Sequence, residues 1–341
     1  MRRITLADIA KEAGVSKMTV SNALRNTGRV SPGMRKKVRS IADRLGYVPD
    51  PALSALNVYR RGREGGRRRF NLAYVTGFAT RSGWRQLLYY EDYFRGAVER
   101  ADELGYRLRE YWLGEGGFSA RRNGDILESR GVLGVILSPY QFPQDHPDLD
   151  LSRFAAVALG RSLLQPHVHR ASNDQFLSMI MLLDRLRERG YRRIGLYLHR
   201  TAHEKTQFRW SAAYREWCGN ARDGVVSLPP LLRNRQPVKA LTSWVREHRP
   251  DIVISSNDVA IRQLRKAGWR VPKDIAYADL AVRRPDSATS GIYQRPVATG
   301  KAAMDLLHLL LQRNDRGPPA VPETISLEGQ WIEGETAPRR D

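Results

Sequence analysis

The stretch Thr5–Asn22 constrains the fold of this chain more than any other, because it fits two short helices joined by a tight turn. Ile9 and Ala10 lie on one apolar helix face, and Val20 resumes an apolar face after Gly14 interrupts the pattern. A small residue at 10 lets two helices cross closely, and Gly14 tolerates a positive φ in the turn. The stretch therefore predicts a helix-turn-helix unit.

The second of these helices carries a polar face directed away from its apolar one. Ser16 is expected to cap its first turn, because a serine hydroxyl can accept an unpaired N–H there. The outward residues are Lys17, Met18, Thr19, Ser21, Asn22 and Arg25. They offer donors, acceptors and one apolar contact, as a helix that contacts base edges in the DNA major groove requires. Plain core packing would not need this pattern, so the stretch predicts DNA binding.

A third helix is predicted to begin at Ser31-Pro32, a serine cap followed by proline in the first turn, and to end at Gly46. Its apolar stripe closes a three-helix core and comprises Met34, Val38, Ile41, Ala42 and Leu45. Basic residues lie mostly outside the stripe, at Arg35, Lys36, Lys37 and Arg39. They form a solvated face, from which some could contact phosphates.

Positive charge is concentrated in this N-terminal part of the chain. The 341 residues carry a formal net charge of +21. Residues 1–69 hold seventeen Lys and Arg against five Asp and Glu, a net charge of +12, which leaves +9 for the other 272 residues. A basic excess that coincides with a predicted helix-turn-helix indicates a polyanionic partner.

Asp50-Pro51 is another cap-plus-proline signal and predicts a short helix that ends near Tyr59. A helix of two turns is marginal alone, so it should form only with a partner. Leu53 and Leu56 share one face, which could pack on a twin helix, enter the DNA minor groove, do both, or only cover the core. Residues 60–69 contain glycines and charges but no apolar residue, which predicts a flexible linker near the DNA.

From Phe70 onward, strand-like and helical segments alternate. The strand-like runs are 71–75, 134–137, 155–159, 194–198 and 251–255, and the amphipathic stretches are 91–104, 119–130, 174–189, 204–217, 237–248 and 258–267. This alternation predicts doubly wound parallel sheets. Because the pattern restarts near Asn173, we expect two α/β lobes that bind a ligand between the carboxyl ends of their strands.

The runs TLADIAKEAGVSKMTVSNALRN and VSPGMRKKVRSIADRLGYVPDPALSAL resemble the DNA-binding end of the lactose-repressor (LacI-type) family of bacterial transcription regulators. A looser resemblance extends over nearly the whole chain. It implies a helix-turn-helix domain at 1–48, a hinge helix and basic linker at 49–69, and an effector-binding and dimerisation domain at 70–341. The expected fold is an all-α DNA-binding head plus an α/β periplasmic-binding-protein-like domain of two parallel-sheet lobes.

The same resemblance implies how the chain divides between the lobes and what the hinge does. The N-lobe would comprise about 70–160 and 295–316, and the C-lobe about 161–294 and 317–335. The hinge helix would pair with its twin and lever Leu56 into a central base step, bending the DNA. Leu53 departs from the usual alanine of the family; we include both leucines among the expected DNA-contacting residues.

Four effector-binding residues follow from the resemblance: Ser138, Asp174, Arg209 and Asp258. Asp174 matches the aspartate that opens the family's Asp-Asn motif, and Arg209 matches an arginine that points into the cleft. These two could equally form a structural ion pair or cap helices. Val271-Pro272 and Gln294 match further family segments.

Two departures from the family pattern concern the cleft. Ala281 stands where the family has an aspartate that commonly binds sugar hydroxyls, and the helix from Asp258 to Gly268 is about one turn short. A hexose site of the usual kind is therefore not expected. Either an altered ligand or no ligand is consistent with these residues.

The sequence contains no convincing catalytic, metal or cofactor motif. Phosphate-loop, dinucleotide, nucleophile-elbow and zinc-protease patterns are absent. His167 and His169, like His199 and His203, lack a third ligand and are interpreted as surface or loop histidines. Cys218, the single cysteine, is expected to be buried. With no signal peptide and no apolar run of bilayer length, we expect a cytoplasmic protein that does not enter membranes.

These observations predict a homodimeric transcriptional regulator, a repressor by default, that binds a pseudo-palindromic operator in double-stranded DNA. Lys17, Met18 and Asn22 would contact base edges, while Ser16, Thr19, Ser21 and Arg25 would contact phosphates. A sugar, nucleoside or other small metabolite in the cleft would modulate DNA affinity. Two alternatives remain: an architectural DNA-binding protein with a vestigial cleft, and a small-molecule enzyme fused to a DNA-binding head.

Overall fold

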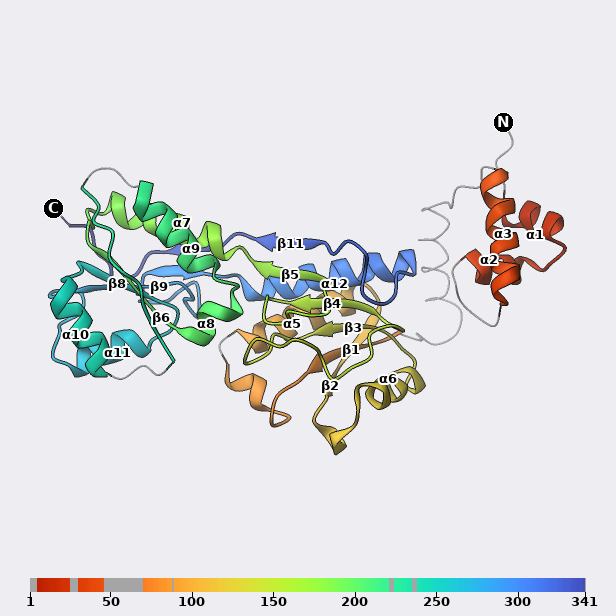
Figure 1. The fold of residues 1–341 in the computed structure, drawn as a ribbon, viewed down its shortest axis with the longest axis horizontal. Coiled ribbons are helices and arrows are strands. Elements are labelled where there is room, and N and C mark those ends of the chain that lie inside the picture. Colours follow the sequence, from red (N-terminus) through yellow and green to blue (C-terminus); the bar gives the residue numbers. More distant parts are fainter. Residues whose placement is uncertain are drawn as a thin grey trace.

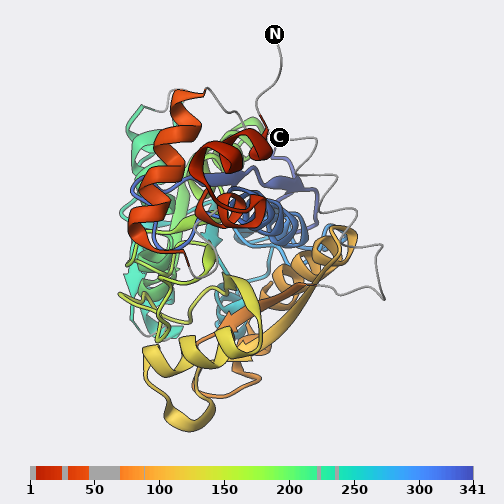
Figure 2. The same ribbon diagram turned by 90° about the vertical axis from the view of Figure 1, so that its right-hand side faces the viewer.

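The computed structural model describes residues 5–24, 30–45, 70–87, 89–220, 224–234 and 238–340. Three helices form an N-terminal head, and two α/β lobes form the rest (Figures 1 and 2). No helix in these ranges is both long and apolar enough to cross a bilayer. The predicted fold class is confirmed.

Helices α1 (Leu6–Ala13), α2 (Lys17–Leu24) and α3 (Pro32–Arg44) pack around a small apolar core. Ile9, Val20 and Val38, one from each helix, are fully buried at its centre. The turn between α1 and α2 depends on Gly14, whose φ of 70° is costly for residues with a Cβ. This confirms the predicted helix-turn-helix and its three-helix core.

The first lobe, or N-lobe, contains a six-stranded sheet in which every strand pair is parallel, in the order β11-β5-β4-β3-β1-β2. Its strands are β1 (Phe70–Thr76), β2 (Tyr106–Trp112), β3 (Val132–Leu137), β4 (Ala155–Leu159), β5 (His169–Asn173) and β11 (Thr324–Leu327). Alternate residues of β1 enter two cores. Leu72 and Tyr74 pack with α5 (Tyr90–Glu103) and α12 (Pro296–Arg313), while Ala73 and Val75 pack with α6 (Ala120–Ser129).

The second lobe, or C-lobe, has a sheet in the order β12-β10-β9-β8-β6-β7, with only β12 antiparallel to its neighbour. Its strands are β6 (Ile194–His199), β7 (Leu231–Arg233), β8 (Ile252–Ser255), β9 (Ala276–Asp279), β10 (Gly291–Tyr293) and β12 (Gln330–Ile332). One core packs against α7 (Gln175–Glu188) and α9 (Arg209–Asn220), and the other against α10 (Val238–His248) and α11 (Val259–Lys266). A short helix, α8 (Arg200–Lys205), follows β6.

The chain passes between the lobes later than the sequence indicated. Because β5 and β11 belong to the first sheet, two of the passages follow Asn173 and Leu327 instead of lying near 160 and 316. The reason is that β5 has the polar sequence HRASN, although all five residues are buried, so it lacks an apolar strand pattern. The remaining passage, near 294, lies between β10 and α12 as expected.

The predicted helix over 204–217 is instead two helices, α8 and α9. Gln207 and Phe208 between them have φ values of 51° and 65°, which a continuous right-handed helix excludes. In the N-lobe, α5 and α12 approach so closely that Cβ atoms at Gly96 and Gly300 would lie 2.0 Å from the Val297 carbonyl oxygen and 2.1 Å from that of Tyr93. Glycine at both positions therefore holds the two helices in backbone contact.

Candidate functional site

Helix α2 of the head turns its small apolar residues inward and its polar residues outward. Val20 and Ala23 are completely buried, whereas Met18 is 71% exposed. Lys17 is also exposed, and Ser21 and Asn22 are half-buried on the flanks of this face. The helix thus presents a cation, a thioether and polar side chains, which is the chemistry of a major-groove contact. Arg25, Leu53 and Leu56, also predicted to contact DNA, lie outside the described residues.

Ser16 caps α2 as predicted, since its Oγ accepts the backbone N–H of Thr19 at 3.0 Å. The hydroxyls of Ser16 and Thr19 also form a hydrogen bond of 2.9 Å with each other. Ser16 is exposed and Thr19 half-buried. Their hydroxyls therefore lie together at the first turn of α2, where backbone N–H groups favour an anionic partner.

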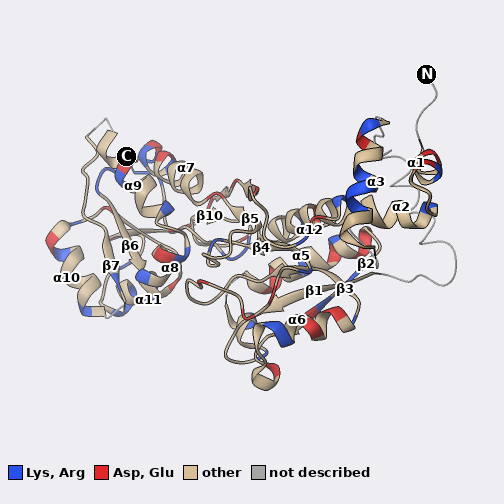
Figure 3. Ribbon diagram, turned by 45° about the vertical axis from the view of Figure 1, so that its right-hand side comes forward, with Lys and Arg blue, Asp and Glu red and all other residues tan. Residues whose placement is uncertain are grey.

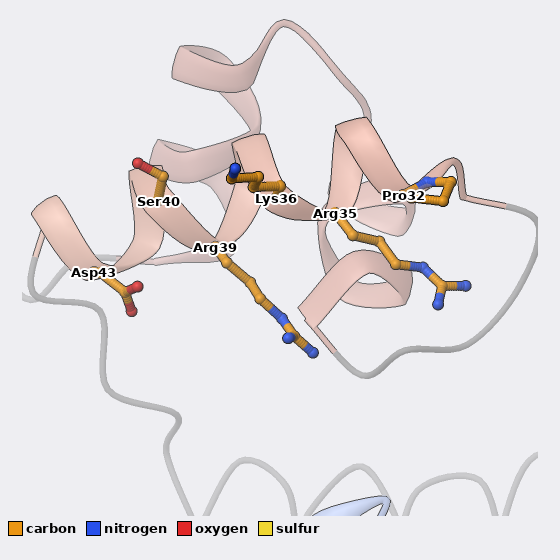
Figure 4. Close-up of a pocket in the computed structure, with 6 residues that line it drawn as sticks. All are labelled: Pro32, Arg35, Lys36, Arg39, Ser40 and Asp43. Carbon is orange, nitrogen blue, oxygen red and sulfur yellow. The ribbon is translucent and has the colours of Figure 1, made fainter.

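Helix α3 adds a basic surface beside α2 (Figure 3). A shallow groove along it is lined by Pro32, Arg35, Lys36, Arg39, Ser40 and Asp43 (Figure 4). The side chains of Arg35 and Arg39 extend to the same side of the helix. Three cations line the groove against one carboxylate, that of Asp43. This excess of positive charge makes the groove suited to a polyanion.

The other basic residues of α3 hold the head together. Lys37 Nζ donates to the Ala13 carbonyl oxygen at 3.2 Å, which pairs a cation with the C-terminus of α1. Arg44 forms an ion pair with Glu12. The basic residues of this helix thus divide into a structural pair and a groove-lining set.

A cavity of about 280 Å³ lies between the two lobes. It is bounded by the segments that follow β3, β4, β8, β9 and β10, where parallel sheets commonly bind ligands. Its lining residues are Leu87, Tyr89, Tyr90, Tyr93, Pro139, Gly160, Arg161, Ser162, Gln175, Ala202, Lys205, Thr206, Trp210, Ser256, Asn257, Ala281 and Gln294. Both lobes contribute, so the cavity depends on how the lobes meet.

The four predicted effector residues lie beside this lining, and in each case a neighbour in sequence takes part in it. Asp174 caps α7, accepting the N–H groups of Phe176 at 3.1 Å and Leu177 at 3.0 Å. Asp258 is 63% exposed and pairs with Arg262. Asp174 therefore caps a helix, which is the alternative that the sequence left open, whereas Asp258 precedes α11 without a side-chain capping hydrogen bond.

Ser138 and Arg209 are placed differently from the two aspartates. The Ser138 side chain is buried and its Oγ has no hydrogen-bond partner, and the buried Nε of Arg209 has none either. Arg209 lies close enough to Arg161 and Arg170 for its charge to lower both of their pKa values. It therefore belongs to a cluster of three arginines at the edge of the cavity.

Sequence reasoning missed two cations in the cavity wall, Arg161 and Lys205. Arg161 follows Gly160 directly after β4, at the carboxyl end of a buried strand, and that position was the available signal. Lys205 ends α8, and its Nζ donates to Tyr90 Oη at 2.7 Å. Burial lowers the pKa of Lys205 to about 8. Because Tyr90 begins α5 of the N-lobe, this hydrogen bond joins the two lobes.

Ala281 lines the cavity, as its alignment with the missing aspartate indicated. The nearby Asp279 is buried and accepts hydrogen bonds from Ala281 N at 2.8 Å and Tyr277 Oη at 3.1 Å. Burial raises the pKa of Asp279 to about 7. Its carboxyl group is therefore only partly ionised at neutral pH and supplies part of a negative charge to this side of the cleft.

The interpretation of the histidines as surface or loop residues is wrong for His169 and His203, which are buried in β5 and α8, and His199 ends β6. The histidines and the cysteine have structural contacts. His199 Nδ1 accepts the N–H of Thr201 at the start of α8, and His169 Nδ1 accepts the N–H of Glu323. Cys218 is buried as predicted. Within the part of the chain that the structure describes, no group of three or more His, Cys, Asp or Glu side chains could hold a metal.

Both the head and the lobes match models of known protein families. Residues 5–50 match the model of the bacterial regulatory proteins of the lacI family, and residues 183–337 match the periplasmic binding protein-like domain. The HTH-type transcriptional regulator GntR of Escherichia coli (strain K12) is 45% identical over 291 residues, covering 81% of each chain. The chain spans about half the length of two mycobacterial regulators that it also matches, 55% and 53%.

Solved structures share the fold. A complex of the transcriptional regulator CelR with cellobiose superposes with a TM-score of 0.59 and 23% identity, covering 98% of this chain and 100% of that one. A lac repressor dimer bound to operator and the anti-inducer ONPF gives a TM-score of 0.56 and 18% identity, covering 98% and 99%. The likeness extends over the head as well as both lobes.

Proposed function

This chain belongs to the lacI family of bacterial regulatory proteins. We propose that it is a homodimeric transcriptional repressor whose affinity for operator DNA depends on a small molecule in the cleft. The observation that carries the proposal is the outer face of α2. Exposed Lys17 and Met18 are held outward by a core that buries Val20 completely. The proposal places the protein in the cytoplasm, where it would meet chromosomal DNA.

Base contacts are assigned to Lys17, Met18 and Asn22, and phosphate contacts to Ser16, Thr19, Ser21 and Arg25. A helix of eight residues reaches only a few base pairs, so two heads on a pseudo-palindromic site are needed for useful specificity. The operator-bound dimer among the structural neighbours supports this arrangement. The domain division at 48 and 69 and the minor-groove role of Leu53 and Leu56 are part of the same proposal.

The cleft is assigned to the effector. It lies between two lobes that the chain crosses three times, so a ligand that prefers one closure state shifts the balance between states and the affinity for DNA. The cellobiose complex of a protein with this fold supports the location. Ser138 and Arg209 are proposed to support the ligand from behind the lining. Asp174 positions α7 by capping it, and Asp258 forms a surface ion pair with Arg262 at the start of α11.

The first experiment tests base reading by α2. DNA selected by the purified protein would be sequenced for the wild type and for Lys17→Ala, with Lys36→Ala from the α3 groove as the matched control. Lys17→Ala should relax preference at one base position in each half-site by about 1–3 kcal/mol, whereas Lys36→Ala should weaken all sequences equally. A uniform loss for Lys17→Ala would assign that lysine to phosphate. Equal binding of selected and random DNA by the wild type would refute the proposed function.

A second measurement separates regulation from a vestigial cleft. Small metabolites would be screened for a rise in melting temperature, and those that bind would be tested for a change in operator affinity. A ligand that changes both excludes the vestigial cleft. A ligand that is turned over during the assay would favour the enzyme alternative.

A further inference from the structure

The cavity wall is positively charged. Of its lining residues, Arg161 and Lys205 are cations and none is Asp or Glu; the others that can hydrogen-bond are neutral tyrosines, serines, amides, a threonine and a tryptophan. Arg161 comes from the N-lobe side and Lys205 from α8 of the C-lobe. The cations therefore face the same space from opposite lobes.

Arg161 lacks the partners that a buried guanidinium normally has. Its Nε is buried without a hydrogen bond, and among the described residues it forms no ion pair. Burial, with repulsion from the nearby Arg209 and Arg170, lowers the pKa of Arg161 to about 10. Arg170 is itself satisfied, because it donates to the carbonyl oxygens of Gly160 at 3.2 Å and Leu163 at 3.3 Å. Arg161 is thus a cation in need of an acceptor.

Neither Asp174 nor Asp279 supplies a full acceptor for Arg161. Asp174 attracts Arg161, but its Oδ1 already accepts two backbone N–H groups at the start of α7. Asp279 lies near Tyr89 on the other side of the cleft, and burial keeps its pKa near 7. A buried charge without a full partner is costly, so the cluster is incomplete as it stands.

The unpaired polar atoms around the cavity are mostly donors. Arg161 Nε, Arg209 Nε and Trp210 Nε1 can only donate, and the hydroxyls of Tyr89 and Ser138 can do either; each is buried without a partner. Gln175 Oε1 is the obligate acceptor in the same state among the described residues of the cavity wall. A ligand that satisfies this set must bring more acceptors than donors.

Lys205 has capacity left as well. Its ammonium group makes one hydrogen bond to Tyr90 and lies 5.4 Å from the centre of that ring, and no carboxylate pairs with it among the described residues. An ammonium group has three N–H donors. Two are therefore available to a ligand that also contacts Arg161.

We propose that the cleft selects a small organic anion, with its carboxylate or phosphate bound between Arg161 and Lys205, over a neutral sugar. This deepens the proposed effector function and rests on it. The cavity of about 280 Å³ is near the lower limit of ligand pockets, about 300 Å³, which suits a metabolite of monosaccharide size. An anion held by cations from both lobes favours their closure, because only the closed state brings both cations to it.

The test compares each anion with the neutral sugar from which it derives. Aldonates, uronates and sugar phosphates of four to six carbons would be measured beside their parent sugars by thermal shift and calorimetry on the full chain. At least one anion should bind about tenfold more tightly than its parent, since hydrogen bonds to charged groups are stronger than neutral ones. The carboxylate and phosphate arms identify which group is recognised.

Arg161→Gln and Lys205→Gln should each weaken the anion about 10–100-fold and leave the neutral parent within about twofold. Arg265→Gln, an exposed arginine on α11, is the matched control and should change neither. Melting temperatures without ligand would show that the variants fold. The ratio of anion to parent affinity is the decisive readout, because a merely structural role would lower both affinities together.

Three results would overturn the inference: a parent sugar that binds as tightly as its anion, no stabilisation by any anion at millimolar concentration, or an unchanged affinity ratio in Arg161→Gln. Measuring operator binding with the same preparation distinguishes failure of the anion preference from failure of the proposed regulatory function. If a neutral sugar binds and shifts operator affinity, the regulator stands and the anion preference fails. If anions bind but DNA binding shows no sequence preference, the anion preference stands and the proposed regulatory function fails.

Discussion

The head and the cleft both gather positive charge, but they expose it to water differently. On the head, Lys17, Lys36 and Arg39 are exposed and lie on two neighbouring helices. In the cleft, the Nε of Arg161 and the Nζ of Lys205 are enclosed by other groups. Exposed charges act over about 8–10 Å and are screened by salt, so they attract any polyanion. Enclosed charges act at contact distance and can discriminate between small molecules.

The largest expected effect tests whether the head and the lobes fold independently of each other. Val20→Asp would place a charge in the fully buried centre of the head, at a cost of about 4 kcal/mol or more. A three-helix core this small should not survive it, so operator binding should be lost while ligand binding in the cleft is kept. Fluorescence anisotropy with operator DNA and calorimetry with a cleft ligand would measure the two.

Val321→Asp makes the same chemical change at a residue that is 78% exposed, and it should alter neither activity. Loss of ligand binding in Val20→Asp would contradict the separation of head and cleft, because it would mean that the lobes need a folded head to hold their ligand.

A second prediction concerns the buried carboxyl group of Asp279 beside the cleft. Asp279 has an ordinary pKa of 3.8 and a folded pKa of about 7, so between these values the folded chain holds a proton that the unfolded chain has released. The stability of the wild type should therefore fall as pH rises through this window, by up to about 4 kcal/mol. Asp279→Asn removes this component, and urea unfolding at pH 5 and pH 8 would show it gaining stability relative to wild type at the higher pH.

Asp286→Asn, at an aspartate that is 71% exposed and paired with Arg284, is the control and should follow the wild type. A stability difference between Asp279→Asn and wild type that does not vary with pH would show that this carboxyl group ionises normally in the folded protein.

The smallest expected effect concerns one exposed cation. Arg39→Gln should lower operator affinity severalfold at physiological salt and reduce the slope of log K against log salt by about 1, equally for all DNA sequences. Arg265→Gln should leave that slope unchanged. By contrast, anion binding in the cleft should vary little with salt. A slope that is unaltered in Arg39→Gln would remove the α3 groove from the DNA contact.

The sequence predicted the head well because the unit is local. Its caps, turn glycine and apolar spacing lie within one short segment, so helical periodicity alone places Ile9, Val20 and Val38 in one core. The lobes were predicted as a class, yet β5 was missed. Its burial comes from pairing with β4 and β11, and nothing in HRASN itself marks a strand.

The cleft could be predicted only to within a residue or two. Its wall is assembled from segments far apart in sequence, and whether a side chain at a strand end points into the space depends on local backbone geometry. At 138–139, 174–175, 209–210 and 257–258, the predicted residue and the lining residue are adjacent. Lys205 could not be placed, because the break at Gln207 and Phe208 that ends α8 has no glycine or proline to mark it.

The backbone contact at Gly96 and Gly300 has a mechanical consequence. It fastens α5, which begins at Tyr90 in the cavity wall, to α12, which begins next to the passage between the lobes near residue 294. Helix α12 has 18 residues, about 27 Å in length, and runs toward the side of the molecule where the head lies (Figure 1). Turning this stiff pair by about 5° would move its distant end by roughly 2 Å. A ligand bound in the cavity would thus displace the end of α12 that lies toward the head without any helix changing shape.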